Sequence, residues 1–169
     1  GSIWGHLPAA LAAQGVSRPL VFAVLAVDAT SMSDWTRAGS PLPGLLDETL
    51  RKMAALGMPA DLVLWQQGES DARLQTAASA YLSGLHQLMA QVNSHGRAVP
   101  LVLAKSTVCR SAASAEIRGA LDHAVAADSQ FRPGPDTDSL STDLHRSDGC
   151  HFSAMGLHQA ALLWSSSIA

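Results

Sequence analysis

Two residues near the carboxyl end of the chain have the types and the spacing of a catalytic acid–base pair. Asp148 precedes His151 by three residues, so its carboxylate can fold back and accept a hydrogen bond from the imidazole. Such a carboxylate fixes the tautomer of the ring and stabilises the imidazolium that forms when the ring takes a proton from a nucleophile. The pair therefore indicates general-base chemistry. A structural loop in which Asp148 caps the turn stays open as the alternative.

A metal site is a further alternative, because His145 stands close to this pair and could join Asp148 and His151 as a ligand. The other histidines lie in helical patterns or beside turns, and no cofactor motif accompanies them. We therefore expect neither a cofactor nor a metal.

A second group of polar residues follows the apolar run Leu62-Val63-Leu64 directly, in the string Trp65-Gln66-Gln67-Gly68-Glu69-Ser70-Asp71. Polar side chains at a strand exit, around a glycine that permits close approach of the backbone, suit a binding cleft. A simple turn with a helix cap also explains this composition, because serine and aspartate cap helices well.

The elements that must position these residues are predicted from the apolar pattern. Three nearly continuous runs, 20–27, 62–65 and 101–104, predict strands buried on both faces of a parallel sheet. Helical spacing predicts helices over 46–57, 74–92 and 117–125, and a last helix over 154–166 with Ser153 as its N-cap. The proline-rich and polar segment 128–150 is predicted to be a long loop.

Strands that alternate with helices predict an α/β fold with a parallel sheet between two helical layers, a three-layer α/β/α sandwich. Ligands bind such sheets at the carboxyl ends of the strands. The segment 65–71 follows a strand directly, and 147–153 lies on the loop before the last helix. Both polar segments can therefore reach this edge.

Composition limits the classes of function. The 169 residues, 47% hydrophobic and 15% charged, predict one domain over 1–169. A net charge of −3 without a basic run argues against nucleic acid as a partner. The longest apolar stretch, 19–27, is far shorter than the roughly 20 residues of a membrane helix, so no membrane partner is expected.

The spacing of Cys109 and Cys150 fits no zinc motif, and free buried thiols are the simplest interpretation.

Taken together, the polar segments resemble the SGNH hydrolases, in particular their sialate O-acetylesterase and acetylxylan-esterase branch. The string 65–71 is similar to the branch's Trp-x-Gln-Gly-Glu-(Ser/Ala)-Asp block, and Asp148-Gly149-Cys150-His151 resembles its Asp-x-x-His block. The segment 26–35 resembles a Gly-Gly-Thr-Ser segment followed by a tryptophan. Gly1-Ser2-Ile3-Trp4 resembles the start of the preceding helix.

The resemblance implies a flavodoxin-like sheet and a serine esterase that hydrolyses acetyl or short-acyl esters of O-acetylated carbohydrates through an acyl-enzyme. The substrate would be a carbohydrate or other small-molecule ester. His151 would be the general base and Asp148 its orienting carboxylate. The amide of Gln67 would donate to the oxyanion, while Gly68 and Glu69 would shape the pocket.

The nucleophile is the first departure from the family pattern. The family's serine stands in a Gly-x-Ser block after the first strand, and this sequence holds no such block. We expect that block and the first strand on a separate N-terminal segment that completes the domain, because the sheet would otherwise expose an apolar edge. Within the chain, Ser31 is the substitute nucleophile. A carbohydrate-binding relative that has lost its nucleophile is the alternative function.

The second departure is Asp28-Ala29, which stands where the family has Gly-Gly. Ala29 can donate its N–H to the oxyanion only if its backbone avoids a positive φ.

The resemblance also bears on the two cysteines. A disulfide between Cys109 and Cys150 would hold the loop of the acid–base pair against the sheet. It would also imply an oxidising compartment and hence a secreted or periplasmic protein.

Overall fold

Three parallel strands form the sheet in the order β1-β2-β3. They are β1 (Val63–Trp65), β2 (Leu101–Lys105) and β3 (Phe131–Asp136). This is a computed structural model, which describes residues 2–169. Leu64 stands opposite Val102, and Val102 stands opposite Arg132. The predicted strands at 62–65 and 101–104 are thus confirmed, and the structure shows that they are neighbours.

The central strand β2 is buried on both faces, as its uninterrupted apolar run predicts. Leu101 and Leu103 belong to the core on one side of the sheet, whereas Val102 and Ala104 belong to the core on the other side. Successive side chains of a strand point to opposite faces, so a strand covered by helices on both sides needs apolar residues at every position.

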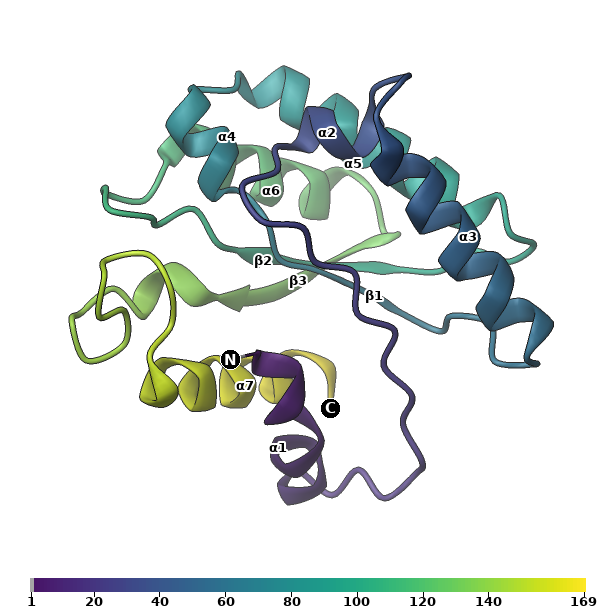
Figure 1. Cartoon of the computed structure of the whole chain (residues 1–169), viewed down its shortest axis with the longest axis horizontal. Coiled ribbons are helices and arrows are strands. Elements are labelled where there is room, and N and C mark those ends of the chain that lie inside the picture. The colour runs from purple at the N-terminus through teal and green to yellow at the C-terminus, as the bar shows by residue number, and fades with distance from the viewer. Residues whose placement is uncertain (1) are drawn as a thin grey trace.

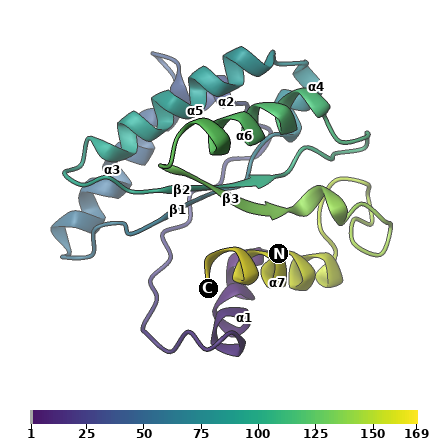
Figure 2. The ribbon, with the colours of Figure 1, turned by 180° about the vertical axis from the view of Figure 1, so that it is seen from behind.

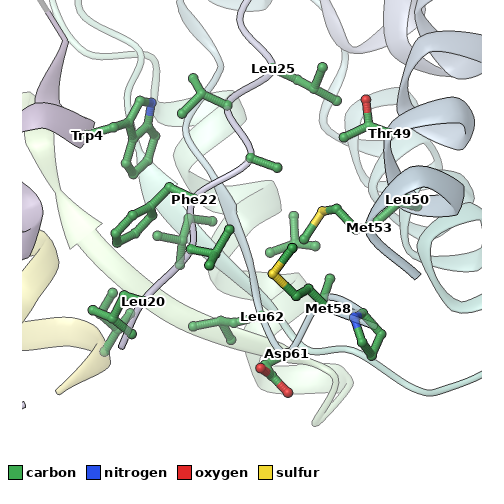
Figure 3. A pocket seen from close by; sticks show the side chains of 18 of the residues that line it. Trp4, Leu20, Phe22, Leu25, Thr49, Leu50, Met53, Met58, Asp61 and Leu62 are labelled. Atoms are coloured by element: carbon green, nitrogen blue, oxygen red, sulfur yellow. The ribbon is translucent and has the colours of Figure 1, made fainter. Parts of the chain in front are cut away.

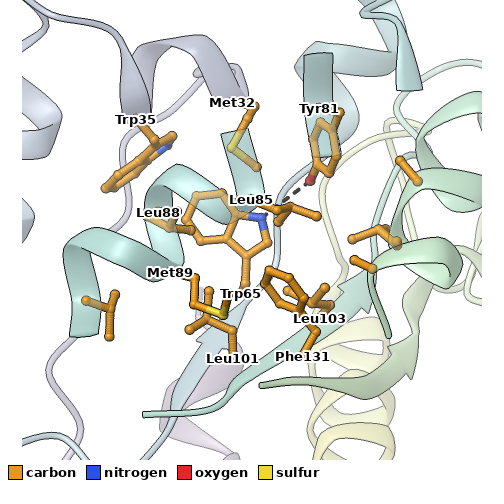
Figure 4. Packing of buried hydrophobic residues seen from close by; sticks show 14 of the residues in the cluster. Met32, Trp35, Trp65, Tyr81, Leu85, Leu88, Met89, Leu101, Leu103 and Phe131 are labelled. Atoms are coloured by element: carbon orange, nitrogen blue, oxygen red, sulfur yellow. Dashed lines mark hydrogen bonds between the residues drawn. The ribbon is translucent and has the colours of Figure 1, made fainter. Parts of the chain in front are cut away.

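One face of the sheet carries most of the helices: α2 (Met32–Thr36), α3 (Pro41–Ala55), α4 (Glu69–Leu74), α5 (Ala78–Asn93) and α6 (Ala115–Ala127) (Figures 1 and 2). Trp65 is central to this core and packs edge-to-face on Trp35, with ring centroids 5.6 Å apart (Figure 4). Its indole N–H donates to the hydroxyl of Tyr81 at 3.4 Å. This contact ties the end of β1 to α5.

The opposite face is covered by the 3₁₀ turn η1 (Ile3–Gly5), α1 (Leu7–Ala13) and α7 (Ala154–Ile168), which lie together in Figure 1. Trp164 of α7 is fully buried and donates its indole N–H to the side chain of Gln66 at 2.7 Å. Ser153 is the N-cap of α7, as predicted, and accepts from the N–H of Gly156 at 3.1 Å. Gly1 lies outside the described residues.

The layers confirm the α/β/α sandwich with a parallel sheet. Among the described residues, no helix combines the length and the apolar character that crossing a membrane requires.

The predicted strand over 20–27 is wrong. Although its residues have strong β propensity, this segment passes β1 as an irregular chain that makes no ladder with it (Figure 1). A strand exists only where its backbone groups find partners on a neighbouring strand. No strand of the described chain pairs with this segment. Its apolar sequence alone is therefore not enough to make it a strand.

The predicted loop over 128–150 is wrong in its first part, which forms β3. Pro133 and Pro135 argued against a strand because proline lacks an N–H. The carbonyl of Gln130 accepts from Leu101 of β2, and backbone groups alternate along a strand, so Pro133 directs its nitrogen away from β2. Pro135 lies where the register between the two strands shifts. Gly134 fits against the backbone of β2, where a Cβ would lie 2.7 Å from the Leu103 carbonyl.

The single helix predicted over 74–92 is two helices. α4 ends at Leu74, whose side chain is exposed, and α5 begins at Ala78. Gln75 between them adopts the left-handed conformation with φ of 55°, which ends α4. The apolar residues from Tyr81 onwards form the buried face of α5, so the predicted stripe is confirmed for that helix alone.

Candidate active site

The exits of all three strands bring polar residues to one edge of the sheet. The segment 66–69 follows β1, the segment 106–109 follows β2, and the 3₁₀ turn η2 (Thr137–Ser139) follows β3. The long loop 140–153 then lies at this same edge before the chain enters α7 (Figure 1). Because parallel strands end together, segments far apart in sequence meet here.

Asp148 and His151 form a hydrogen-bonded pair on this loop. Nδ1 of His151 lies 2.7 Å from one carboxylate oxygen of Asp148. The other oxygen accepts from the backbone N–H groups of Cys150, at 2.9 Å, and His151, at 2.7 Å. The imidazole side chain is 71% exposed, so its Nε2 edge can meet a substrate.

Hydrogen bonds explain the electrostatics of this carboxylate. The bond to the His151 ring, followed by the backbone bonds from Cys150 and His151, holds the pKa of Asp148 far below its usual range. Asp148 therefore stays ionised near neutral pH, where its carboxylate orients the imidazole. This is the arrangement that a nucleophile–base–orienter triad requires of its last two members.

Arg146 organises the loop from beneath, and sequence reasoning missed it. The residue is only 2% exposed. Its guanidinium donates to the carbonyl oxygens of Leu140, Thr137, Val108 and Cys150. It also lies 4.1 Å from the centre of the Phe152 ring, a cation–π contact. The hydrogen bond to the carbonyl of Cys150 and the contact with the Phe152 ring thus hold the residues on both sides of His151.

Burial lowers the pKa of Arg146, which Glu69 and Asp138 counteract by their charge. No local signal in the sequence separates Arg146 from the exposed Arg110, because both stand in polar loop segments. Arg146 differs from Arg110 only in the folded chain, where carbonyl groups surround its guanidinium.

The structure contains the disulfide Cys109–Cys150, which joins the exit of β2 to the residue before His151. The pairing expected from the resemblance is confirmed, and the interpretation as free thiols is wrong. The bridge closes a loop across a sequence separation of 41 residues.

Replacing both Cys109 and Cys150 by serine should lower the free energy of unfolding by about 4 kcal/mol, because the unfolded chain regains the freedom of a loop of this length. Chemical denaturation of the oxidised wild type and the double variant measures the difference. A reductant should destabilise the wild type and leave the double variant unchanged. Two free thiols in the untreated wild type, found by mass spectrometry, would contradict the bridge.

Gln67 is buried at the exit of β1, and its side chain is fully engaged. The amide nitrogen donates to the Thr30 carbonyl at 3.1 Å and to the Asp71 carboxylate at 2.6 Å. The amide oxygen accepts from the hydroxyl of Tyr81 at 3.1 Å. Both hydrogens of the amide are thus used inside the protein, so Gln67 can donate to an oxyanion only by giving up one of these bonds.

Gly68 and Glu69 fit tightly against the exit of β2. Gly68 has φ of 157°, and a Cβ there would lie 2.7 Å from the carbonyl oxygen of Ser106. The Glu69 carboxylate accepts from the hydroxyl of Ser106 at 2.7 Å. Burial raises the pKa of Glu69, and this outweighs the lowering by the Ser106 bond and by the charge of Arg146. Gly68 therefore permits the close approach of its backbone to the exit of β2, as predicted from its place in the string 65–71.

Asp138 joins the exits of β2 and β3, and the sequence did not single it out. Its carboxylate accepts from the backbone N–H groups of Thr107, at 2.6 Å, and Val108, at 2.9 Å. Arg118 of α6 donates to Asp138 at 2.9 Å and to Asp136 at 2.7 Å, which lowers the pKa of Asp136. The network makes this edge a rigid support for the loop.

Ser31 has the contacts of a helix cap. Its hydroxyl donates to the Asp34 carboxylate at 2.7 Å, and its backbone N–H donates to the same oxygen at 2.9 Å. These two bonds lower the pKa of Asp34, and Ser31 itself is buried. Within the described chain, no hydrogen bond joins the His151 ring to Ser31 or to Gln67. The hydroxyl of Ser31 is therefore bonded to the Asp34 carboxylate and not to an imidazole.

Ala29 does not meet the condition set for an oxyanion donor. Its φ is 58°, in the left-handed region, within a turn in which the hydroxyl of Thr30 donates to the carbonyl of Val27 at 2.9 Å. The turn demands this conformation although alanine carries a Cβ. The finding argues against Ala29 as an oxyanion donor and explains why glycine suits the position.

Ala29→Gly should raise the free energy of unfolding by about 0.5–1 kcal/mol, because glycine removes the left-handed strain but adds freedom to the unfolded chain. Denaturant unfolding of the variant measures this change. Ala38→Gly is the matched control, since Ala38 is also exposed in a loop but has no positive φ. That control should be neutral or slightly less stable, and equal shifts in both variants would contradict the strain at Ala29.

His145 takes part in a different contact from the one a metal site would need. Its Nδ1 lies 3.0 Å from the hydroxyl of Thr142. In residues 2–169, no group of three or more histidine, cysteine, aspartate or glutamate side chains is placed to hold a metal ion.

Comparison with known proteins gives one match. The model of a family of carbohydrate esterases, the sialic acid-specific acetylesterases, matches residues 8–165. No curated protein and no solved structure matches the chain. The match covers almost the whole sequence, including the Gln-Gly-Glu string and the Asp148–His151 pair, and it confirms the resemblance stated from the sequence. The chain belongs to the sialic acid-specific acetylesterase family of carbohydrate esterases.

Proposed function

We propose that this domain is a serine esterase that removes acetyl or other short acyl groups from O-acetylated carbohydrates through an acyl-enzyme. One observation carries the proposal: Asp148 accepts from the imidazole of His151 at 2.7 Å and leaves the opposite ring nitrogen open to solvent. Membership of a carbohydrate esterase family supports the reaction class. The nucleophilic serine lies on an N-terminal segment that completes the single domain formed with residues 1–169.

In the first half of the reaction, Nε2 of His151 takes the proton of the serine hydroxyl while the oxygen attacks the acyl carbon. The tetrahedral intermediate collapses when its carbon–oxygen bond to the sugar breaks, and His151 returns the proton to the departing sugar oxygen. Water then attacks the acyl-enzyme by the same steps, releasing the carboxylic acid and restoring the serine. Asp148 remains ionised throughout and stabilises the imidazolium.

The oxyanion needs donors that act when its charge develops. The backbone N–H of the nucleophilic residue itself is one such donor in serine hydrolases. Gln67 is the second, provided that it exchanges its longer bond, 3.1 Å to the Thr30 carbonyl, for one to the oxyanion. A donor of this kind contributes about 3 kcal/mol of transition-state stabilisation. Gly68 and Glu69 hold the turn against Ser106 and so keep Gln67 in place.

The test is hydrolysis of p-nitrophenyl acetate and of an O-acetylated sugar by the protein that carries the N-terminal segment. We expect acetate release that a serine-directed phosphonate abolishes and a chelator leaves unchanged. Mass spectrometry should place the phosphonate on a serine outside residues 1–169. Loss of activity with a chelator, but not with the phosphonate, would replace the proposal by a metal-dependent hydrolase.

A non-catalytic carbohydrate-binding domain is the second candidate. It is favoured by the absence of any serine hydroxyl bonded to the His151 ring within residues 2–169. Such a domain would bind O-acetylated sugars with an affinity that calorimetry can measure, and it would release no acetate. The preserved Asp148–His151 bond supports the esterase, since sugar binding alone does not need it.

We further propose that the protein is secreted or periplasmic. The Cys109–Cys150 disulfide supports this location, because reducing compartments keep most thiols unpaired. Fractionation of cells that produce the protein, followed by non-reducing mass spectrometry, tests it.

A further inference from the structure

The loop that carries the base of the proposed active site has no regular structure of its own. His151 is 71% exposed, and residues 140–153 contain no helix or strand. In the described chain, a single backbone–backbone hydrogen bond joins this loop to the exit of β2, from the N–H of Arg110 to the carbonyl of Gly149 at 2.7 Å. A general base needs a fixed position, because a displacement of about 1 Å can lower a rate a hundredfold. The loop therefore needs support from side chains.

The buried guanidinium of Arg146 gives this support from two neighbouring strand exits. It donates to the carbonyl of Val108 after β2, at 3.1 Å, and to the carbonyl of Thr137 after β3, at 3.2 Å. The nitrogen that bonds Val108 also donates to the carbonyl of Cys150, the residue before His151. One planar group thus joins both strand exits to the backbone beside the base.

These bonds leave Arg146 little capacity to bind a substrate. A guanidinium has five N–H groups. Four of them donate to carbonyl oxygens, those of Thr137, Leu140, Val108 and Cys150. The residue is also only 2% exposed. Any effect of Arg146 on the reaction must therefore pass through the loop that it holds.

We propose that Arg146 is the positioning residue of the catalytic base, and that its guanidinium, rather than the Cys109–Cys150 disulfide, fixes the orientation of His151. The importance of this orientation for catalysis rests on the esterase function proposed above. The orientation itself can be measured without the reaction.

The disulfide joins the same two segments but acts on a different state of the chain. A bridge between Cys109 and Cys150 stabilises the protein mainly by restricting the unfolded chain. In the folded chain, the bond between Arg110 and Gly149 and the bonds of Arg146 already join these segments. The bridge therefore contributes stability, and the guanidinium contributes geometry.

Arg146→Lys separates the shape of the group from its charge. Lysine keeps the positive charge that interacts with Glu69 and Asp138, but its ammonium has no planar fork to reach carbonyl groups on both strand exits. With p-nitrophenyl acetate, kcat should fall about a hundredfold while KM stays unchanged. The disulfide remains closed in this variant, so the loop stays tethered and only its orientation changes.

The double variant Cys109→Ser, Cys150→Ser makes the opposite change, because it removes the tether and keeps the guanidinium. It should retain kcat within about twofold of the wild type at a temperature at which it is folded.

NMR of the His151 ring tests the orientation directly. Proton–nitrogen correlation spectra show which nitrogen of the neutral ring carries the proton, and the hydrogen bond to Asp148 selects Nδ1. Arg146→Lys should weaken this selection and give a mixture of tautomers. The double cysteine variant should keep the wild-type spectrum.

Two variants of α3 are the controls. Leu50 is buried and lines an apolar groove of about 910 Å³, whose lining includes no residue of the loop 140–153 (Figure 3). Leu50→Val should therefore lower stability by the loss of a methylene group but leave kcat and the His151 spectrum unchanged. Arg51→Lys, at an exposed arginine, controls for the exchange of arginine for lysine.

Phe152→Leu tests the same support more gently, should Arg146→Lys fail to fold. It keeps an apolar side chain but removes the ring whose centre lies 4.1 Å from the guanidinium. The loss of this cation–π contact should lower kcat about fivefold and shift the His151 spectrum in the same direction. Unchanged kcat and an unchanged spectrum in this variant would count against the positioning role.

Several outcomes would overturn the inference. One is a folded Arg146→Lys protein with the wild-type ring spectrum, and another is a changed spectrum without any loss of kcat. A hundredfold loss in the double cysteine variant would assign the orientation to the disulfide instead, and an equal loss in Leu50→Val would assign the effect to stability.

Failure of the proposed function gives a different result. A wild-type protein that releases no acetate, but whose His151 spectrum changes in Arg146→Lys and not in the double cysteine variant, would contradict the esterase and support the positioning of the ring by Arg146. An active wild type whose kcat and spectrum are unchanged in Arg146→Lys would support the esterase and contradict the positioning role.

Discussion

Replacing His151 by alanine is expected to lower kcat of ester hydrolysis by about a millionfold, the effect of losing the general base in other serine hydrolases. Without the imidazole, the serine hydroxyl keeps its proton at neutral pH and is a poor nucleophile. KM should change little, because the ring acts on the nucleophile rather than on the sugar. Steady-state kinetics with p-nitrophenyl acetate and an O-acetylated sugar measure both parameters.

Folding should not confound this result. The imidazole is 71% exposed, and surface substitutions usually change stability by no more than about 0.5 kcal/mol. His123→Ala, at an exposed histidine on α6, is the matched control and should retain full activity. If the His151 variant kept more than about one hundredth of the wild-type kcat with intact folding, the imidazole would not be the base.

Asp148→Asn is the second change with a very large expected effect, a decrease in kcat of about 10⁴-fold. Asparagine fits the site and can still accept from the backbone N–H groups of Cys150 and His151. Its amide nitrogen, however, donates where the carboxylate accepts, so the ring turns to the wrong tautomer and the imidazolium loses its counter-charge. The pH–rate profile and kcat of the variant measure the loss.

The pKa of Asp148 sets the pH dependence of this comparison. Because that pKa is far below its usual range, the carboxylate remains ionised over the assay range and contributes no acid limb of its own. The stabilisation that it provides is present above the unfolded pKa of about 4 and is lost as the pH falls towards the folded value. The wild type should therefore lose its small stability advantage over Asp148→Asn in acid.

Asp143→Asn is the control for this variant, because Asp143 is an exposed aspartate on the same loop. It should leave both kcat and stability unchanged. Full activity in Asp148→Asn would show that the 2.7 Å bond to His151 is structural. A loss of activity accompanied by a loss of the Cys109–Cys150 disulfide would instead indicate a disordered loop.

Local patterns in the sequence carried much of the fold and the site. Uninterrupted apolar runs marked the strands around Leu64 and Val102, because a strand covered on both faces must be apolar at every position. The helices α3, α5, α6 and α7 followed from apolar spacing, and Ser153 followed from the chemistry of N-caps. The spacing of three residues between Asp148 and His151 was sufficient to predict the hydrogen bond between their side chains, because both residues lie within one turn of the chain.

Tertiary structure decided whatever depends on a distant partner. The run 20–27 has the composition of a strand but, in the described chain, finds no neighbour to pair with. The proline-containing β3 pairs with β2 because Pro133 directs its nitrogen away from that strand. Arg146 is buried only because four carbonyl groups from separate segments converge on it, and Gln67 is engaged only because Thr30, Asp71 and Tyr81 surround it. Backbone pairing and the satisfaction of buried polar groups are properties of segments brought together by folding, so no local pattern encodes them.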